Sequence, residues 1–99
     1  MLYYVAHCYG DSEDNYDRAE RITHDLQMND LGNCYICPLL VFSRMTYCEI
    51  GYDEEMELRL DLLSCCDKLI VASGISDGVR REIEFADLVG MEVEYLEAD

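Results

Sequence analysis

The sequence predicts a small α/β domain, with a parallel sheet of about four strands and helices on both faces. Its 99 residues leave room for one hydrophobic core. Short apolar runs of strand length alternate along the chain with segments in which apolar residues recur at helical spacing. Strands separated by helices are typical of parallel sheets, because each crossover returns the chain to the same end of the sheet. We therefore expect residues 1–99 to form a single domain.

Four segments are expected in the first half of the chain. The run Leu2–Ala6 is rich in β-branched and aromatic residues and predicts a strand buried on both faces. Residues 15–28 carry small or apolar side chains at helical spacing and predict the first helix. Residues 34–40 predict a second strand, which Pro38 stops or bends because proline lacks an amide hydrogen. Residues 41–52 show no periodicity and predict a long loop.

The second half predicts two helices and two strands. Three carboxylates open the expected helix at 53–65, where the helix dipole favours negative charge. A strand is expected at 69–73, and the loop 74–78 leads from it into a helix at 79–89. An alternating pattern predicts the last strand at 91–96.

Composition excludes several classes of protein. The chain has 22 acidic and 7 basic side chains, a formal charge of -15, and 51% apolar residues, which is too apolar for a disordered chain. Nucleic acid and anionic membranes are bound through Lys and Arg, so this charge argues against both as partners. No apolar run approaches the roughly 20 residues that span a bilayer, and the first residues lack a signal-peptide pattern. We expect a cytoplasmic protein.

The six cysteines are expected to remain thiols and to be buried mostly as small hydrophobic residues. Cys34 and Cys37 have metal-ligand spacing, but residues three apart in a strand point to opposite faces of a sheet. Cys65 and Cys66 are adjacent, and no second pair with metal spacing follows. Gly-x-Gly-x-x-Gly and the Walker A lysine are also absent. We therefore expect neither a metal nor an organic cofactor.

The expected site lies beyond the carboxyl ends of the strands, where ligands bind in open parallel sheets. Two loops, residues 7–14 and 74–78, meet there. Ser76, Asp77 and Gly78 open a helix whose free amides suit a phosphate or a sugar hydroxyl, and Glu82 follows one turn later. A capped helix with an acidic first turn would explain the same residues without a ligand, and this alternative stays open.

Several short motifs together point to a family. In chain order they are Leu-Tyr-Tyr-Val-Ala-His-Cys-Tyr-Gly, Asn15 with Arg18-Ala19, Cys66-Asp67, and Ser-Asp-Gly-Val-Arg-Arg-Glu-Ile-Glu-Phe-Ala. Across nearly its whole length the chain resembles the nucleoside 2-deoxyribosyltransferase-like superfamily, which includes 2'-deoxynucleoside 5'-phosphate N-hydrolases and short bacterial and phage proteins. The Ser-x-Gly-x-x-x-Glu element, with Ala86 four residues on, is the most specific part.

The resemblance implies a flavodoxin-like or Rossmann-like sheet, a nucleoside or nucleotide ligand, and a homodimer or higher homo-oligomer. A phage-encoded relative would act in the host cytoplasm. In this family a carboxylate attacks the anomeric carbon and releases the base, and Glu82 stands at its position. The candidate catalytic residues are Glu82 and His7, and the candidate ligand-binding residues are Tyr4, Cys8, Tyr9, Gly10, Arg59, Ser76, Asp77 and Gly78. For Tyr4, which the resemblance puts near the nucleophile, a purely structural role in a buried strand is an open alternative.

Two positions depart from the family pattern. Arg59 stands where the family usually has an aspartate that helps the base leave, and arginine cannot supply a proton near neutral pH. Either another acid, such as Asp61 or Glu55, substitutes, or base departure is not catalysed. In the first loop, His7-Cys8 replaces the usual small residues and offers a titratable imidazole as an acid.

Three functions therefore stay open. The first is an enzyme that cleaves or transfers at the N-glycosidic bond through Glu82. The second is a binding protein that sequesters a nucleotide-derived signal, for example of the ADP-ribose type, with Arg59 paired to phosphate. The third is an acidic interaction module that mimics DNA. Thiol catalysis at Cys8 is disfavoured, because His7, as its neighbour in an extended chain, points to the other side.

Overall fold

The computed structural model describes residues 1–10, 12–46 and 50–96. Its strands are β1 (Leu2–Ala6), β2 (Cys34–Ile36), β3 (Lys68–Val71) and β4 (Glu92–Tyr95), and its helices are α1 (Glu13–Asn29), α2 (Pro38–Thr46), α3 (Tyr52–Ser64) and α4 (Asp77–Leu88). Two parts of the expected loops, Asp11 and 47–49, lie outside the described residues, as do residues 97–99. Helices α1, α3 and α4, and strands β1, β3 and β4, begin and end within a residue or two of the expected positions.

The four strands form one sheet in the order β2-β1-β3-β4, and every neighbouring pair is parallel. The α/β fold with a parallel sheet is thus confirmed, in a Rossmann-like or flavodoxin-like arrangement. Strands β1 and β3 lie at the centre, and Val5 pairs with Ile70 between them. The chain leaves β1 toward β2 on one side and later continues through β3 to β4 on the other. The strand order therefore reverses between β1 and β3, where ligands bind in such sheets.

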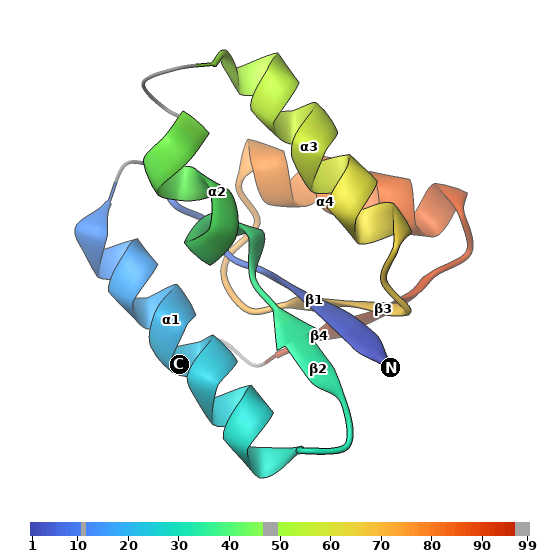
Figure 1. The fold of residues 1–99 in the computed structure, drawn as a ribbon. Coiled ribbons are helices and arrows are strands. Elements are labelled where there is room, and N and C mark those ends of the chain that lie inside the picture. The colour runs from blue at the N-terminus through green and yellow to red at the C-terminus, as the bar shows by residue number, and fades with distance from the viewer. Residues whose placement is uncertain (11, 47–49, 97–99) are drawn as a thin grey trace.

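Helices cover both faces of the sheet, as expected, with α1 on one side and α3 and α4 on the other (Figure 1). The two faces follow from the alternation of side chains along β1. Tyr4 and Ala6 pack in one core cluster with Leu63 of α3 and Ala86 of α4. Val5 faces the opposite side and packs in a cluster with residues of α1 and of the start of α2.

One segment differs from the expectation. The second strand ends at Ile36 rather than at residue 40, and helix α2 occupies the first half of the expected loop at 41–52. Pro38 begins this helix, because its fixed φ and missing amide hydrogen suit a first helical turn. Leu39 is 1% exposed and packs in the cluster that contains Val5. Burial of Leu39 therefore stabilises a helix whose sequence lacks clear periodicity.

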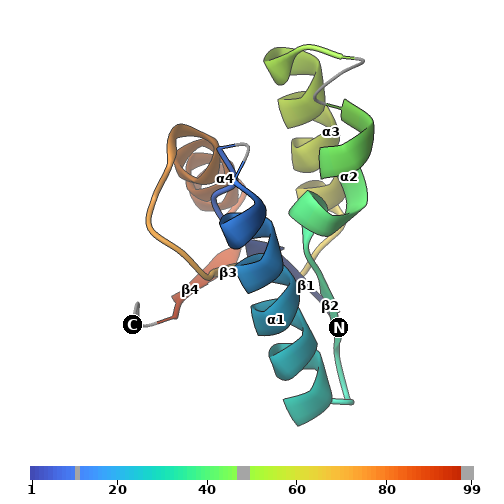
Figure 2. The same cartoon turned by 90° about the vertical axis from the view of Figure 1, so that its left-hand side faces the viewer.

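Helix α2 contacts α1 and α3, and it lies beside α3 in the rotated view as well (Figure 2). It thereby connects the helical layers of the two faces at the side of the domain where β2 ends. Across the described ranges no helix is both long and apolar enough to cross a bilayer, and α1, with 17 residues, carries charged side chains along its length.

Two glycines provide a matched test of backbone strain. Gly90 follows the end of α4 with φ +73°, a conformation that side chains rarely adopt, whereas Gly74 has no such φ. A Cβ at either position would meet no other group within 4 Å. We expect Gly90→Ala to lower the free energy of unfolding by about 1 kcal/mol and Gly74→Ala to leave it unchanged or slightly higher. Urea denaturation measures both, and equal stability of the two variants would contradict the expectation.

Candidate functional site

A cleft opens where the loops after β1 and β3 meet. The loops are joined directly, because the amide of Cys8 donates a hydrogen bond of 2.9 Å to Oγ of Ser73. The cleft has a volume of about 310 Å³. Its lining residues are His7, Cys8, Tyr9, Gly10, Tyr52, Arg59, Ser76, Asp77 and Gly78. The structure thus brings together all the sequence-predicted ligand-binding residues except Tyr4, and it adds Tyr52.

The start of α4 forms one wall of this cleft. Ser76 caps the helix, and its Oγ accepts a hydrogen bond of 3.3 Å from the amide of Val79. The amides of Asp77 and Gly78 belong to the first turn, where a helix offers no carbonyl to bind them. These amides and the positive end of the helix dipole suit an anion.

Gly78 lets α3 approach α4 closely at this wall. A Cβ on Gly78 would lie 3.3 Å from Cε of Met56, 3.4 Å from Oη of Tyr52 and 3.6 Å from Nη1 of Arg59. A larger residue would therefore press on the α3 side chains, including the guanidinium. This explains a glycine at this position without invoking backbone strain.

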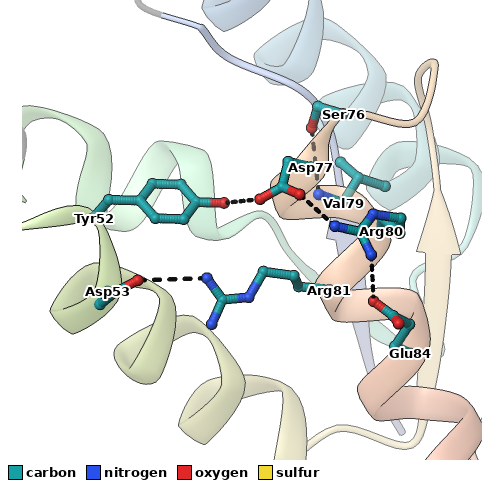
Figure 3. Close-up of polar contacts among 8 residues, drawn as sticks. All are labelled: Tyr52, Asp53, Ser76, Asp77, Val79, Arg80, Arg81 and Glu84. Carbon is teal, nitrogen blue, oxygen red and sulfur yellow. Dashed lines mark hydrogen bonds and ion pairs between the residues drawn. The ribbon is translucent and has the colours of Figure 1, made fainter.

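The polar contacts beside the cleft tie α3 to α4 (Figure 3). Tyr52 donates a hydrogen bond of 3.1 Å to Asp77, and Arg80 bonds the other oxygen of the same carboxylate. These contacts, that of Arg80 first, lower the pKa of Asp77. Arg81 lies 3.6 Å from Asp53 and its guanidinium stacks over the ring of Tyr52, with 5.7 Å to the ring centre.

The three arginines near the site therefore have different roles. Arg80 and Arg81 pair with carboxylates of α3 and α4 and do not line the cleft, whereas Arg59 lines it. Among the described lining residues Arg59 is the only cation, and Asp77 is the only carboxylate. The cleft is thus not a strongly positive pocket.

Behind the cleft, four ionisable side chains are packed together and buried. They are Tyr4 of β1, Glu55 and Arg59 of α3, and Glu82 of α4. Oη of Tyr4 donates to Oε2 of Glu82, and Nε of Arg59 donates to Oε1 of Glu55. Within the described part of the chain, Oε1 of Glu82 has no hydrogen-bond partner.

Burial dominates the charge state of Glu82, which is 1% exposed. Desolvation raises the pKa of Glu82 to about 7, against the opposing effects of the Tyr4 hydrogen bond and the charge of Arg59. Burial and the neighbouring Glu82 also raise the pKa of Tyr4 well above its usual range. Although burial disfavours the charged form of Arg59, Glu82 and Glu55 raise its pKa overall. Arg59 therefore remains charged.

Glu82 does not line the cleft, although the sequence indicated it as the nucleophile. It lies four residues after Gly78, so both face the same side of α4, with Glu82 one turn deeper. Arg59 connects the cleft with the buried side chains behind it, since it lines the cleft and also interacts with Glu82. Of the two acids considered as substitutes for the family aspartate, Glu55 is the partner of Arg59, and Asp61 is exposed.

The geometry of His7 does not favour the acid role expected from the sequence. Its Nδ1 lies 2.7 Å from the carbonyl oxygen of Cys8, which only accepts hydrogen bonds, so Nδ1 carries the proton. In the neutral ring Nε2 is then an acceptor, and in the described structure this buried atom has no partner. Burial lowers the pKa of His7, so the ring is neutral at pH 7.

The remaining loop residues shape the cleft mouth. Gly10 has φ +55°, which favours glycine and turns the chain toward α1. Tyr9 packs edge-to-face against Tyr16 of α1, with ring centres 6.4 Å apart. No group of three His, Cys, Asp or Glu residues in the described ranges has a geometry that would hold a metal ion.

Sequence reasoning missed Tyr52 as a site residue because it stood at the end of an expected loop. Its spacing of seven residues from Arg59 is a signal that could have found it, since residues seven apart share one helix face. The Glu55–Arg59 ion pair could also have been predicted from the sequence, because residues four apart in a helix are neighbours on its surface.

Residues 1–96 match the model of a protein family described as a domain of unknown function, DUF7768. No curated protein and no solved structure shows a significant match to the chain.

The raised pKa of Glu82 predicts a pH-dependent stability. Its ordinary value is 4.5 and its value in the fold is about 7, so the folded state binds the extra proton between these pH values. The stability that Glu82 contributes is therefore present below pH 4.5 and is lost as the pH rises through about 7. We expect Glu82→Gln to gain stability relative to the wild type between pH 5 and pH 8, as measured by urea denaturation.

Glu84→Gln is the matched control on the same helix. Glu84 is exposed and lies 3.0 Å from Arg80, so its substitution should change stability little at any pH in this range. If Glu82→Gln showed the same pH dependence as the wild type, the buried ionisation of Glu82 would be contradicted.

Proposed function

The chain belongs to the DUF7768 family, and we propose that it binds a nucleoside or nucleoside monophosphate in the cleft and cleaves the N-glycosidic bond. One observation carries the proposal. A buried carboxylate, Glu82, lies one turn below the start of α4 that lines the cleft, with one oxygen held by Tyr4 and the other free of hydrogen bonds in the described structure. This arrangement suits a nucleophile that is oriented but not neutralised.

A structural role alone explains Glu82 poorly. A buried carboxyl oxygen without a hydrogen-bond partner is destabilising, and an apolar side chain would fill the same space without that penalty. Groups with strongly perturbed pKa values beside a cleft are typical of catalytic sites. Glu82, with a pKa raised to about 7, has this property. A glutamate that only stabilised the first turn of a capped helix would not need a raised pKa.

The proposed reaction follows from the position of the free oxygen. Oε1 of Glu82 attacks the anomeric carbon, the bond from that carbon to the base nitrogen breaks, and the electron pair leaves with the base. Water then hydrolyses the glycosyl ester, which releases the sugar and regenerates the carboxylate. Tyr4 orients the carboxylate by holding Oε2. Because Glu82 is buried, ligand binding must move the side chains above it.

The charges around the cleft limit the ligand to one phosphate group or none. The protein carries a formal charge of -15, which repels polyanions. Arg80 and Arg81 are already paired with carboxylates, so the cleft offers a phosphate group mainly the first-turn amides of α4. These donors match a single phosphate better than a diphosphate or triphosphate.

A second candidate is binding without cleavage. It is favoured by the 1% exposure of Glu82, which keeps the carboxylate from a ligand in the cleft as the structure stands. Arg59 would then pair with the phosphate of a sequestered nucleotide. The two candidates share the ligand and differ only in the chemical step, so the release of free base separates them.

The nucleophile assignment predicts the behaviour of Glu82→Gln. Incubation with nucleosides and nucleoside monophosphates, followed by chromatography of free bases, should show release by the wild type and none by this variant. The amide keeps the size and the acceptor for Tyr4, so ligand affinity measured by calorimetry should remain. Glu84→Gln should release base at the wild-type rate, since Glu84 is an exposed residue of the same helix. Tight binding without release by the wild type would favour sequestration.

The reaction should also depend on pH through the ionisation of Glu82. A carboxylate attacks only when ionised, and the pKa of Glu82 in the free protein is about 7. We therefore expect kcat/KM to rise with pH and to level off above about pH 7, with a slope of one on the acid side. A rate that is constant from pH 5 to pH 8 would contradict this assignment.

A further inference from the structure

The guanidinium of Arg59 is held at one side and open at the other. Nε bonds Glu55, and Arg59 is 6% exposed. Its two terminal nitrogens make no hydrogen bond within the described structure, although neither is fully buried. Nη1 lies 3.6 Å from the position that a Cβ of Gly78 would take, and both residues line the cleft. The free N–H groups of Arg59 are therefore available to a ligand.

Arg59 also lies within electrostatic range of Glu82, with which it interacts directly by charge. In the proposed function Glu82 attacks the anomeric carbon, so the atoms bonded to that carbon come close to Glu82 during the reaction. One of these atoms is the nitrogen of the departing base. A fixed cation near the reacting centre stabilises negative charge that develops there.

Resting on the proposed function, we infer that Arg59 stabilises the base as it departs as an anion, and that the substrates are nucleosides of acidic bases such as the pyrimidine-2,4-diones. The bond from the anomeric carbon to nitrogen breaks, and its electron pair stays on the base, delocalised over nitrogen and carbonyl oxygens. Two N–H groups of a guanidinium can bond such an anion. The free anion then takes a proton from water.

Asp77, His7 and Tyr52 of the cleft are poor proton donors. Arg80 and Tyr52 lower the pKa of Asp77, and burial lowers the pKa of His7, whose Nδ1–H is directed to a backbone carbonyl. Tyr52 directs its hydroxyl to Asp77. Cytosine forms a less stable anion than the imide bases, and both cytosine and adenine leave more readily once a ring nitrogen is protonated. The cleft chemistry therefore favours bases that need no proton.

The first test uses the wild type and a series of 2'-deoxynucleoside 5'-monophosphates. The bases are 5-fluorouracil, uracil, thymine, cytosine and adenine. We expect kcat/KM for base release to fall as the pKa of the base N–H rises, with uracil released about 100-fold faster than cytosine. Comparable rates for all bases would overturn this inference but not the proposed function. No release from any substrate would overturn the proposed function, and this inference with it.

The second test compares Arg59→Gln on two leaving groups. Uracil leaves as an anion, whereas 7-methylguanine leaves as a neutral molecule from its cationic nucleoside and needs no cation beside it. The variant should release uracil at least about 100-fold more slowly and 7-methylguanine at nearly the wild-type rate. Retained release of 7-methylguanine also shows that the variant is folded. Arg21→Gln, which changes an exposed arginine of α1, should leave both rates unchanged.

Two results of the second test would overturn the inference. One is an equal loss of rate for both leaving groups, which would make Arg59 a structural partner of Glu55 and Glu82. The other is an increase in KM confined to phosphorylated substrates, which would make Arg59 a phosphate ligand. If thermal melting shows that Arg59→Gln is unfolded, Arg59→Lys keeps the charge without the planar fork. That variant should lose uracil release more than 7-methylguanine release, and equal losses would contradict the assignment.

Discussion

The buried contacts among Tyr4, Glu55, Arg59 and Glu82 join the central strand to two helices of one layer. Two carboxylates so close together in a low-dielectric interior would repel each other, and the guanidinium of Arg59 between α3 and α4 offsets that repulsion. Removing Arg59 would leave the buried carboxylate of Glu55 without its ion-pair partner. This cluster therefore constrains how α3 and α4 pack against β1, and it forms the back of the cleft.

The cleft itself depends on backbone placement more than on side-chain charge. Parallel strands end at one edge of the sheet, and the reversal of strand order between β1 and β3 separates the helices that follow them. Gly78 allows α3 to come close to α4, and the Tyr52–Asp77 hydrogen bond spans the two helices at the exposed end. Arg80 and Arg81 offset the charge of carboxylates beside the cleft, namely Asp77, Glu84 and Asp53.

The strands and three helices were predictable because local patterns were clear. The apolar run at β1 and the acidic first turn of α3 are strong local preferences, and the structure agrees with them. Helix α2 was not predictable, since Cys34 to Ile36 and the residues after Pro38 form one continuous apolar segment. Periodicity cannot divide such a segment into strand and helix, and the burial of Leu39 against the α1 face decides it.

The sequence by itself determined which loops form the cleft, because strand and helix order dictates where carboxyl ends meet, and it indicated nearly all the residues that line it. Only the tertiary structure decided the partners of the charged groups. Arg59 could have faced solvent or the cleft, and the proton of His7 could have been on either ring nitrogen. These outcomes depend on contacts between residues far apart in the chain, such as Tyr4 with Glu82 and α3 with α4. Desolvation in that packing, which no local pattern encodes, sets the charge of Glu82.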